Sequence, residues 1–355
     1  WNGARAVHER FVARGISCLA QNDKGHKVKI NSMEKIRMKK SIFVASLFAA
    51  AVFCGSLVYA ENFEMKSENN YATIQLSNGL KIPQFGIGTY GSSEQQAHDA
   101  VLEALKDGYR HIDAAHAYRN ERGIAKAIKE SGIPRSEIWI TSKLWPTDYS
   151  EGNGAQSIDK MLERLGTDYV DLVYLHQPVG DYMAGYRALE EAVRQGKVHA
   201  IGLSNFDLNE EVFEDVYTKA EIKPVIVQIE LHPYAQRVEF RKKCAKKNLA
   251  VEGWFPLGGS GKGNESLFAD ETIKSLAKKY GKSPAQIILR WHVQEGFSTI
   301  PGSRNAAHIA ENIAVYGFSL SDADMEKIRA LNKERRFYNG TWESAQHFKD
   351  VKINY

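Results

Sequence analysis

Cysteine is scarce in this sequence. Three cysteines occur among 355 residues, and only Cys244 lies beyond residue 60. This excludes a disulfide framework and the paired-cysteine spacing of zinc sites. A cysteine nucleophile needs a partner that lowers its pKa, such as a neighbouring histidine. Cys244 stands instead among lysines in "RKKCAKKN", which is typical of a helix.

The part of the chain that is expected to fold has no excess of positive charge. The whole sequence has a net charge of +4, but residues 1–60 contain ten Lys and Arg and only three acidic residues. They carry +7, which leaves −3 for residues 61–355. A nucleic-acid-binding domain is expected to be basic, so we expect no nucleic-acid partner. The length allows one large α/β barrel or two smaller domains.

A basic segment followed by an uncharged run precedes the expected domain. The run from Ser41 to Tyr59 contains no charged residue. A cut after Ala60 would have Val58 and Ala60 at its −3 and −1 positions. This layout predicts a secretory signal peptide and an exported protein, periplasmic or extracellular. The alternatives are an uncleaved membrane anchor, because the run approaches spanning length, and a cytoplasmic protein whose leader is not used.

Four segments are expected along the chain. Residues 1–32 lack a starting methionine and a sustained apolar period, and we interpret them as non-native or upstream sequence. Residues 33–60 are the predicted signal peptide, and residues 61–70 are a linker. The remainder, residues 71–355, is expected to form a single domain, because no long glycine linker or disordered stretch interrupts it.

The domain begins with a hairpin pattern and continues with repeated apolar runs. Apolar and polar residues alternate in "ATIQLSNGLKIP" around Asn78 and Gly79, which predicts an N-terminal β-hairpin. Eight apolar runs follow, and the amphipathic stretches between them often end in glycine, as helices do. Ser283 and Pro284 predict the start of a late helix. The runs are "FGIGT" (85–89), "YRHID" (109–113), "IWITSKL" (138–144), "YVDLVYLH" (169–176), "VHAIGLSN" (198–205), "VIVQIE" (225–230), "LAVEGWF" (249–255) and "STIPG" (298–302).

Eight strands that alternate with helices predict one (β/α)8 TIM barrel, an α/β fold. A doubly wound sheet is the alternative. It is disfavoured because no early G-x-G-x-x-G occurs, and "GIGTYG" lacks the third glycine.

Polar residues stand at the ends of several apolar runs. Barrel enzymes place their chemistry at the carboxyl ends of the strands, so these residues indicate a site rather than a core. They are Asp113, Tyr118 in the following loop, Lys143, His176, Ser204, Asn205, Gln228 and Trp254.

An aspartate, a tyrosine, a lysine and a histidine at one rim are suited to proton transfer. A lysine beside Tyr118 would stabilise its phenolate and lower its pKa, and Asp113 could hold that lysine in place. Such a phenol can act as a general acid or base. His176 could donate a hydrogen bond to a carbonyl oxygen. A matching hydride must come from a cofactor, because no side chain supplies one.

The chain from about Ala72 onward resembles the aldo-keto reductases, in particular the small bacterial branch that includes diketogluconate reductases. The matching stretches are "GLKIPQFGIGTY", "GYRHIDAAHAYRNE", "ITSKLW", "DLVYLHQP", "GKVHAIGLSNF", "QIELHPY", "WFPLG" and "IPGSRNAAHIAENI". The resemblance implies NAD(P)H-dependent reduction of an aldehyde or ketone.

The resemblance also implies a role for each matching residue. Tyr118 would be the proton donor, Lys143 and Asp113 would tune it, and His176 would orient the carbonyl. The implied cofactor-binding residues are Gly88, Thr89, Asp113, Ser204, Asn205, Gln228, Trp254, Leu257, Gly258, Ser303, Arg304, His308, Glu311 and Asn312. The implied substrate pocket is lined by Tyr90, Trp145 and Gln177.

Some positions depart from the family pattern. Relatives that prefer NADPH often have a lysine and an arginine where this chain has Gly302 and His308. Arg304 replaces them in part, so we expect NADPH as cofactor, with NADH as an alternative. Gln177 stands where tryptophan is commoner and makes the substrate rim more polar. The tail, residues 335–348, is expected to close the pocket as a C-terminal substrate loop.

Two other classes of function are alternatives to a reductase. One is a reductase-like module that binds nucleotide with little turnover. The presence of all four residues suited to proton transfer, Asp113, Tyr118, Lys143 and His176, argues against it. The other is a metal-dependent hydrolase, for which His111, Asp113 and His116 offer no further ligand cluster, so we expect no metal. The expected partner is a small carbonyl compound, with no membrane contact for the mature domain and a monomeric state.

Overall fold

The computed structural model describes residues 71–259, 266–338 and 340–355. The upstream segment 1–32, the predicted signal peptide 33–60 and the predicted linker 61–70 lie outside the described residues. Within the described part of the chain, no helix combines the length and the apolar character needed to cross a membrane.

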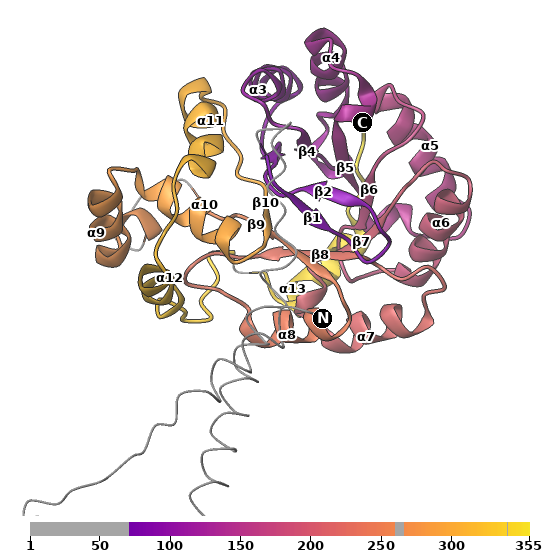
Figure 1. Ribbon diagram of the computed structural model, residues 1–355. Coiled ribbons are helices and arrows are strands. Elements are labelled where there is room, and N and C mark those ends of the chain that lie inside the picture. The colour runs from indigo at the N-terminus through magenta and orange to yellow at the C-terminus, as the bar shows by residue number, and fades with distance from the viewer. Residues whose placement is uncertain (1–70, 260–265, 339) are drawn as a thin grey trace, which may run out of the picture. The chain divides into compact units, whose positions relative to one another are not determined.

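Eight parallel strands form the centre of the domain, and each lies within one of the apolar runs of the sequence. Neighbours in the sheet are also neighbours in the sequence (Figure 1). The strands are β3 (Ile87–Gly88), β4 (His111–Asp113), β5 (Trp139–Leu144), β6 (Leu172–Leu175), β7 (Ile201–Ser204), β8 (Ile226–Glu230), β9 (Ala250–Trp254) and β10 (Ser298–Thr299).

Contacts between the last strand and the segment before β3 close the sheet into a barrel. Phe85 pairs with Thr299 in a parallel bridge. The Gly86 N–H donates to the Thr299 carbonyl at 2.9 Å, and the Gly88 N–H donates to the Pro301 carbonyl at 3.2 Å. The expected (β/α)8 barrel is therefore confirmed.

A β-hairpin covers the amino end of the barrel, as the sequence predicts. Strand β1 (Thr73–Gln75) pairs antiparallel with β2 (Lys81–Pro83). Gly79 turns the chain with φ at +90°, a conformation that side chains disfavour. Leu76 and Ile82 pack with residues that begin the barrel strands, among them Trp139, Leu172 and Ile226. The opposite, carboxyl end of the strands is left for the site.

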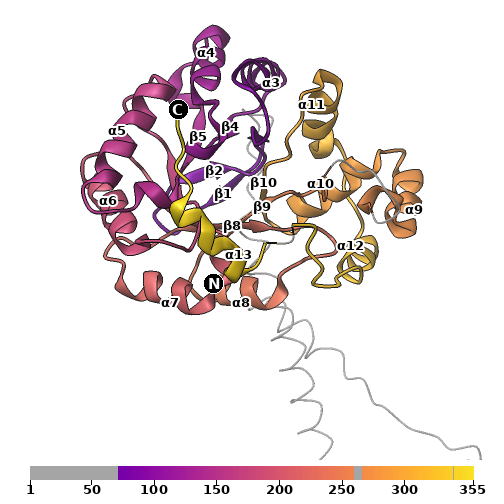
Figure 2. The same ribbon diagram turned by 180° about the vertical axis from the view of Figure 1, so that it is seen from behind.

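Helices surround the barrel on the outside (Figures 1 and 2). They bury an apolar stripe against the sheet, as in α3, whose buried residues include Val101 and Leu105. Ser283 caps α10 and Pro284 opens it, as predicted. The helices are α3 (Glu94–Lys106), α4 (Glu121–Ser131), α5 (Asn153–Leu165), α6 (Tyr182–Arg194), α7 (Glu210–Lys219), α8 (Val238–Lys246), α9 (Glu271–Tyr280), α10 (Pro284–Gln294), α11 (Ala306–Ile313), α12 (Asp322–Arg329) and α13 (Trp342–Ala345).

The segment after α12 runs back over the barrel. Figure 2 shows α13 in front of the strands and the chain end beside α4 and β5. Glu230, at the end of β8, accepts from the Arg336 side chain at 2.8 Å and from the Phe337 N–H at 2.6 Å. The 3-10 helix η7 (Gln346–Asp350) then brings Phe348 to Trp145, with ring centroids 5.1 Å apart. This course fits the expected C-terminal loop.

Candidate active site

The four residues expected to do chemistry come from three neighbouring strands and one loop. Asp113 ends β4, and Tyr118 ends the 3-10 helix η1 (His116–Tyr118) that follows it. Lys143 lies in β5, and His176 follows β6 directly. Because the strands are parallel and neighbouring, their carboxyl ends meet at one rim. The structure brings all four together there.

Lys143 and Asp113 form a buried ion pair. The Lys143 Nζ lies 2.6 Å and 2.7 Å from the two carboxylate oxygens of Asp113 and donates to the Ala114 carbonyl at 2.9 Å. Both side chains are almost fully buried. Burial is the largest single effect and lowers the pKa of Lys143, but the charges and hydrogen bonds of Asp113 and Tyr118 together raise that pKa above its usual value. Lys143 is therefore a fixed cation at this rim.

Tyr118 lies next to that cation and is partly exposed. The Lys143 Nζ is 4.9 Å from the centre of the Tyr118 ring. Burial raises the pKa of Tyr118 to about 12, although Lys143 opposes the shift. Lys143 thus lowers the pKa of Tyr118 as expected, but burial raises that pKa by more. The phenol keeps its proton at neutral pH, which is the state that a proton donor needs.

His176 faces Tyr118 and is uncharged. The two rings lie 5.8 Å apart, nearly perpendicular at 77°. Burial, followed by the charges of Lys143 and His116, lowers the pKa of His176 well below its usual value. Among the described residues, its Nδ1 has no hydrogen-bond partner. A neutral imidazole beside a phenol can direct a carbonyl oxygen toward the proton donor.

A chain of hydrogen bonds links four of the residues that were expected to bind the cofactor, Trp254, Asn205, Ser204 and Gln228. The Trp254 indole N–H donates to Asn205 Oδ1 at 3.0 Å, and Asn205 Nδ2 donates to Ser204 Oγ at 3.1 Å. Ser204 Oγ in turn donates to Gln228 Oε1 at 3.4 Å. Gln228 Nε2 donates to Asp113 Oδ2 at 2.8 Å. The structure therefore joins these four residues to the charged pair.

Gly88 and Thr89 lie beside the segment that precedes α11. A Cβ at Gly88 would come within 2.7 Å of the Ile300 carbonyl oxygen, so only glycine fits there. The Thr89 hydroxyl donates to the Asp113 carbonyl at 2.8 Å. Leu257 and Gly258 belong to the loop after β9, in which Gly258 has φ at +66°.

The expected cofactor-binding residues from Ser303 to Asn312 lie around the start of α11 and along it. Arg304 is exposed, and its Nη1 donates to Gln96 Oε1 at 3.3 Å. Ser303 precedes the Asn305 cap of that helix. Of the remaining residues, His308 is exposed, whereas Asn312 is buried. Glu311 is half-buried.

The three residues expected to line the substrate pocket differ in their exposure and in their contacts. Tyr90 is 80% exposed, and its ring packs edge-on against Tyr118 with centroids 5.2 Å apart. The Trp145 ring contacts His176 at 5.1 Å. Gln177 is buried, and its backbone N–H and carbonyl both bond to the Tyr149 hydroxyl at 3.1 Å. Gln177 thus contributes less to an open rim than its type suggests.

Two features of the rim were missed in the sequence. Glu252 in β9 accepts from Gln228 Nε2 at 2.7 Å. A charged residue within the apolar run "LAVEGWF" was the available signal, because buried acids need partners. Tyr338 packs against Trp254 with ring centroids 5.7 Å apart. Tyr338 belongs to the tail 335–348 that was expected to close the pocket, but no local pattern could predict its contact with Trp254.

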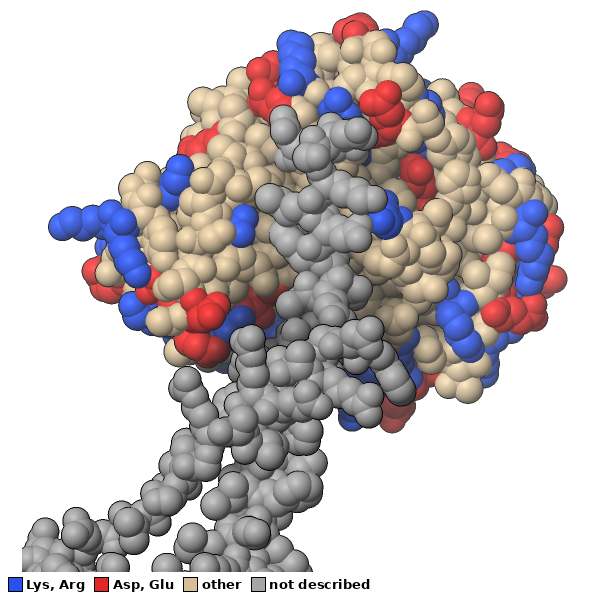
Figure 3. All heavy atoms as spheres, in the orientation of Figure 1, with Lys and Arg blue, Asp and Glu red and all other residues tan. Residues whose placement is uncertain are grey.

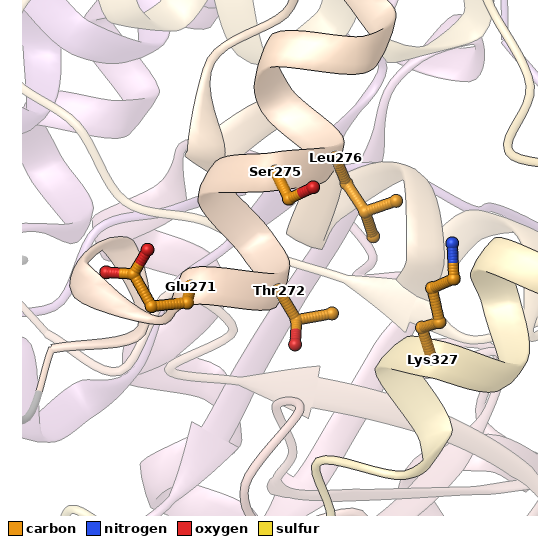
Figure 4. Close-up of a pocket in the computed structure, with 5 residues that line it drawn as sticks. All are labelled: Glu271, Thr272, Ser275, Leu276 and Lys327. Atoms are coloured by element: carbon orange, nitrogen blue, oxygen red, sulfur yellow. The ribbon is translucent and has the colours of Figure 1, made fainter.

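The two histidines of the candidate metal site each have hydrogen-bond partners within the protein. His111 bonds to the Pro83 carbonyl and to Thr141, and His116 bonds to Asp148. Over residues 71–259, 266–338 and 340–355, no three His, Cys, Asp or Glu side chains are placed to bind a metal. A shallow depression between α9 and α12 has none of the expected site residues in its wall (Figure 4); it is lined by Glu271, Thr272, Ser275, Leu276 and Lys327.

Comparison with known proteins yields one family and many relatives. A model of the family described as "Aldo/keto reductase family" matches residues 83–333. A glyoxal reductase of Bacillus subtilis is 41% identical over 266 residues, which cover 74% of this chain and 94% of that protein. A 9,11-endoperoxide prostaglandin H2 reductase of Trypanosoma cruzi is 37% identical over 270 residues, which cover 75% and 94%.

Solved structures give the same result. An aldo/keto reductase of Brucella melitensis is 42% identical, has a TM-score of 0.70, and is matched over 99% of its length and 74% of this chain. A Bombyx mori aldo-keto reductase in complex with NADP is 30% identical and has a TM-score of 0.72. The match covers 98% of that protein and 78% of this chain.

Proposed function

Since the chain belongs to the aldo/keto reductase family, we propose that it reduces an aldehyde or ketone to an alcohol by hydride transfer from NADPH, with Tyr118 as the proton donor. Reductases among the relatives support carbonyl reduction in general. The observation that carries the specific proposal is the contact of Tyr118 with the buried Lys143–Asp113 pair. The substrate is a small carbonyl compound.

The side chains divide the proton transfer between them. When the substrate oxygen takes the Tyr118 proton, a phenolate forms beside the Lys143 ammonium, which stabilises it. Asp113 holds that ammonium through two short hydrogen bonds. Neutral His176 donates a hydrogen bond that holds the substrate oxygen near the phenol. Trp145 and Tyr90 limit the access of water to the same place.

The residues at the rim fit a nicotinamide nucleotide. When bound, the cofactor supplies the hydride that no side chain can provide. The Trp254 ring offers a flat surface, and Ser204 and Asn205 offer hydroxyl and amide groups for the carboxamide. Arg304 is the cation available for a 2′-phosphate, and one solved relative is a complex with NADP. We infer NADPH as the preferred cofactor, with NADH as the alternative.

The test uses residues 61–355 and follows tryptophan fluorescence while NADPH or NADH is added. Turnover of a generic aldehyde is then measured for the wild type and for Tyr118→Phe. We expect tighter binding of NADPH, together with turnover that falls by a factor of about 10² or more in Tyr118→Phe. Binding without turnover in the wild type would instead favour a nucleotide-binding module. An unaffected Tyr118→Phe enzyme would exclude Tyr118 as the donor.

A further inference from the structure

Glu252 is a second carboxyl group inside the barrel, and the proposed reaction assigns it no role. It lies in β9 and is 0% exposed. Gln228 Nε2 donates to Glu252 Oε1 at 2.7 Å and to Asp113 Oδ2 at 2.8 Å. One amide group therefore bridges the two carboxyl groups, and both of its N–H bonds are used.

Side chains from several other strands converge on Glu252. The Tyr174 hydroxyl of β6 donates to Oε1 at 3.0 Å, and the Ser298 hydroxyl of β10 donates to Oε2 at 2.6 Å. On β4, the His111 Nε2 is 3.8 Å from Oε2 but bonds to Thr141 at 3.0 Å. Burial lowers the pKa of His111 to about 4, so this ring is neutral. Glu252 thus links strands across the barrel interior.

The charges around Glu252 favour its neutral form. Lys143 is the buried ammonium group that contacts Asp113, and no contact of an ammonium group with Glu252 is found among the described residues. Burial raises the pKa of both carboxyl groups, and Lys143 opposes this most strongly at Asp113. A second buried anion without its own cation is unfavourable. The hydroxyls of Ser298 and Tyr174 can accept as well as donate, so either can accept a hydrogen bond from the O–H of a protonated Glu252.

We propose that Glu252 is a positioning residue of the reaction: as an uncharged carboxyl group it fixes the side-chain amide of Gln228. The N–H groups of Gln228 then point toward the acids, and its Oε1 points toward Ser204. A chain of hydrogen bonds through Ser204 and Asn205 connects the oriented Gln228 amide to the Trp254 indole. Glu252 touches none of the reacting atoms. The inference rests on the proposed function for its effect on catalysis.

The test compares Glu252→Gln and Glu252→Ala with a matched control, Glu190→Gln. Glu190 in α6 is also 0% exposed, and it accepts hydrogen bonds from the backbone N–H groups of Glu221 and Ile222, which precede the amino end of β8, and from Arg187. For each variant, kcat and KM are measured against pH, and NADPH binding is followed by tryptophan fluorescence. Infrared spectra record the C=O stretch of a protonated carboxyl group. Circular dichroism establishes that each variant is folded.

Glutamine can accept from Gln228 and donate to Ser298, so it should replace a neutral glutamic acid. We expect Glu252→Gln to retain kcat within about threefold, with an unchanged alkaline limb of the pH profile. Glu252→Ala should lower kcat by about tenfold and weaken NADPH binding, with little change in the carbonyl KM. The protonated carboxyl band should be present in the wild type and in Glu190→Gln, and absent from Glu252→Gln.

Several outcomes would overturn the inference. If Glu252 is an anion, its loss lowers the pKa of Tyr118, and the alkaline limb of Glu252→Gln moves to lower pH. A folded Glu252→Ala with wild-type kcat and NADPH binding would remove the positioning role. If the wild type binds NADPH but shows no turnover, the proposed function fails. The infrared band and the NADPH affinities of the variants then still decide the state and the role of Glu252.

Discussion

Lys143 and Asp113 depend on each other because each would be an isolated charge without its partner. The Lys143 Nζ is 2.6 Å from Asp113 Oδ1, and both groups are inside the barrel. The pair thus serves two purposes at the scale of single residues. It compensates two buried charges, and it places a cation beside Tyr118.

Replacement of the lysine by an apolar residue should affect both purposes. In Lys143→Met, Asp113 is left buried without its cation, and we expect the free energy of unfolding to fall by about 3–5 kcal/mol. The phenolate of Tyr118 loses its stabilising charge, so kcat should fall by a factor of about 10² or more. Urea unfolding and steady-state kinetics measure the two effects.

The pH dependence of the stability loss distinguishes the loss of a charge partner in Lys143→Met from a general packing defect. Without Lys143, burial raises the folded-state pKa of Asp113 above its unfolded value. The stability loss should then be largest at neutral and alkaline pH, and it should shrink as the pH falls and Asp113 takes a proton. Adding Asp113→Asn should restore stability without restoring kcat. Lys129→Met, an exposed change in α4, is the control. A stability loss that is the same at every pH would contradict this account.

At the scale of elements, Asp324 joins α12 to α9. Its Oδ2 accepts from the Tyr280 hydroxyl at 2.6 Å, from the Ser321 hydroxyl at 2.8 Å and from Lys279, and Lys327 donates to its Oδ1 at 2.8 Å. The two lysines, followed by Tyr280, hold the pKa of Asp324 well below its usual value. A carboxylate with four donors should therefore stabilise the contact between these helices.

Asp324→Asn should lower the free energy of unfolding at pH 7 by about 2 kcal/mol, because hydrogen bonds to a buried charged group are lost. A lowered folded-state pKa contributes stability above the unfolded pKa, near 4, and this stability is lost as the pH falls below it. The difference between the variant and the wild type should therefore be smaller at pH 3. Urea unfolding at both pH values measures it. Asp322→Asn, an exposed change in the same turn, should have an effect well under 1 kcal/mol. A loss equal at both pH values would refute the ionic contribution.

The elements themselves were predictable from local patterns. Each barrel strand lies within one expected apolar run, since a strand buried on both faces has an unbroken apolar pattern. The start of α10 at Pro284 follows from the Ser283 cap. The strands are shorter than their runs, because hydrogen bonding to neighbours decides where a strand ends. His176, for example, closes its run but follows β6.

The site was predictable only in part. Asp113 and Lys143 could be placed together because neighbouring parallel strands end at one rim. The orientation of Gln228 could not be predicted, because an amide side chain follows its partners and one of these, Glu252, lies on the next strand. The pKa of Tyr118 had the opposite direction from that expected. The sequence reveals the neighbouring lysine, whereas burial depends on the whole rim.

At the scale of the whole molecule, the last segment connects parts that are far apart in the sequence. The Trp145 indole N–H donates to the Val351 carbonyl at 2.7 Å, across 206 positions. The Arg122 N–H donates to the Tyr355 hydroxyl at 3.2 Å, and the Arg164 guanidinium lies 4.8 Å from the Tyr355 ring centre. In Figure 3, basic and acidic side chains are interspersed over the face of the domain that is also seen in Figure 1. Hydrogen bonds and a cation–π contact therefore hold the last segment against Trp145, Arg122 and Arg164.

Removal of residues 351–355 should therefore affect the substrate pocket more than the chemistry. Trp145 loses the partner of its indole N–H and becomes free to turn, while the contact between Tyr118 and Lys143 does not involve the removed segment. We expect the carbonyl KM to rise by about tenfold with kcat within about twofold, because one substrate-binding wall is loosened in ground state and transition state alike. Tyr355→Phe, which loses only the hydroxyl, should change KM less than the truncation. Steady-state kinetics with one aldehyde would measure both variants. A fall in kcat at unchanged KM would mean that the segment acts on the proton-transfer residues instead of on the wall that Trp145 forms.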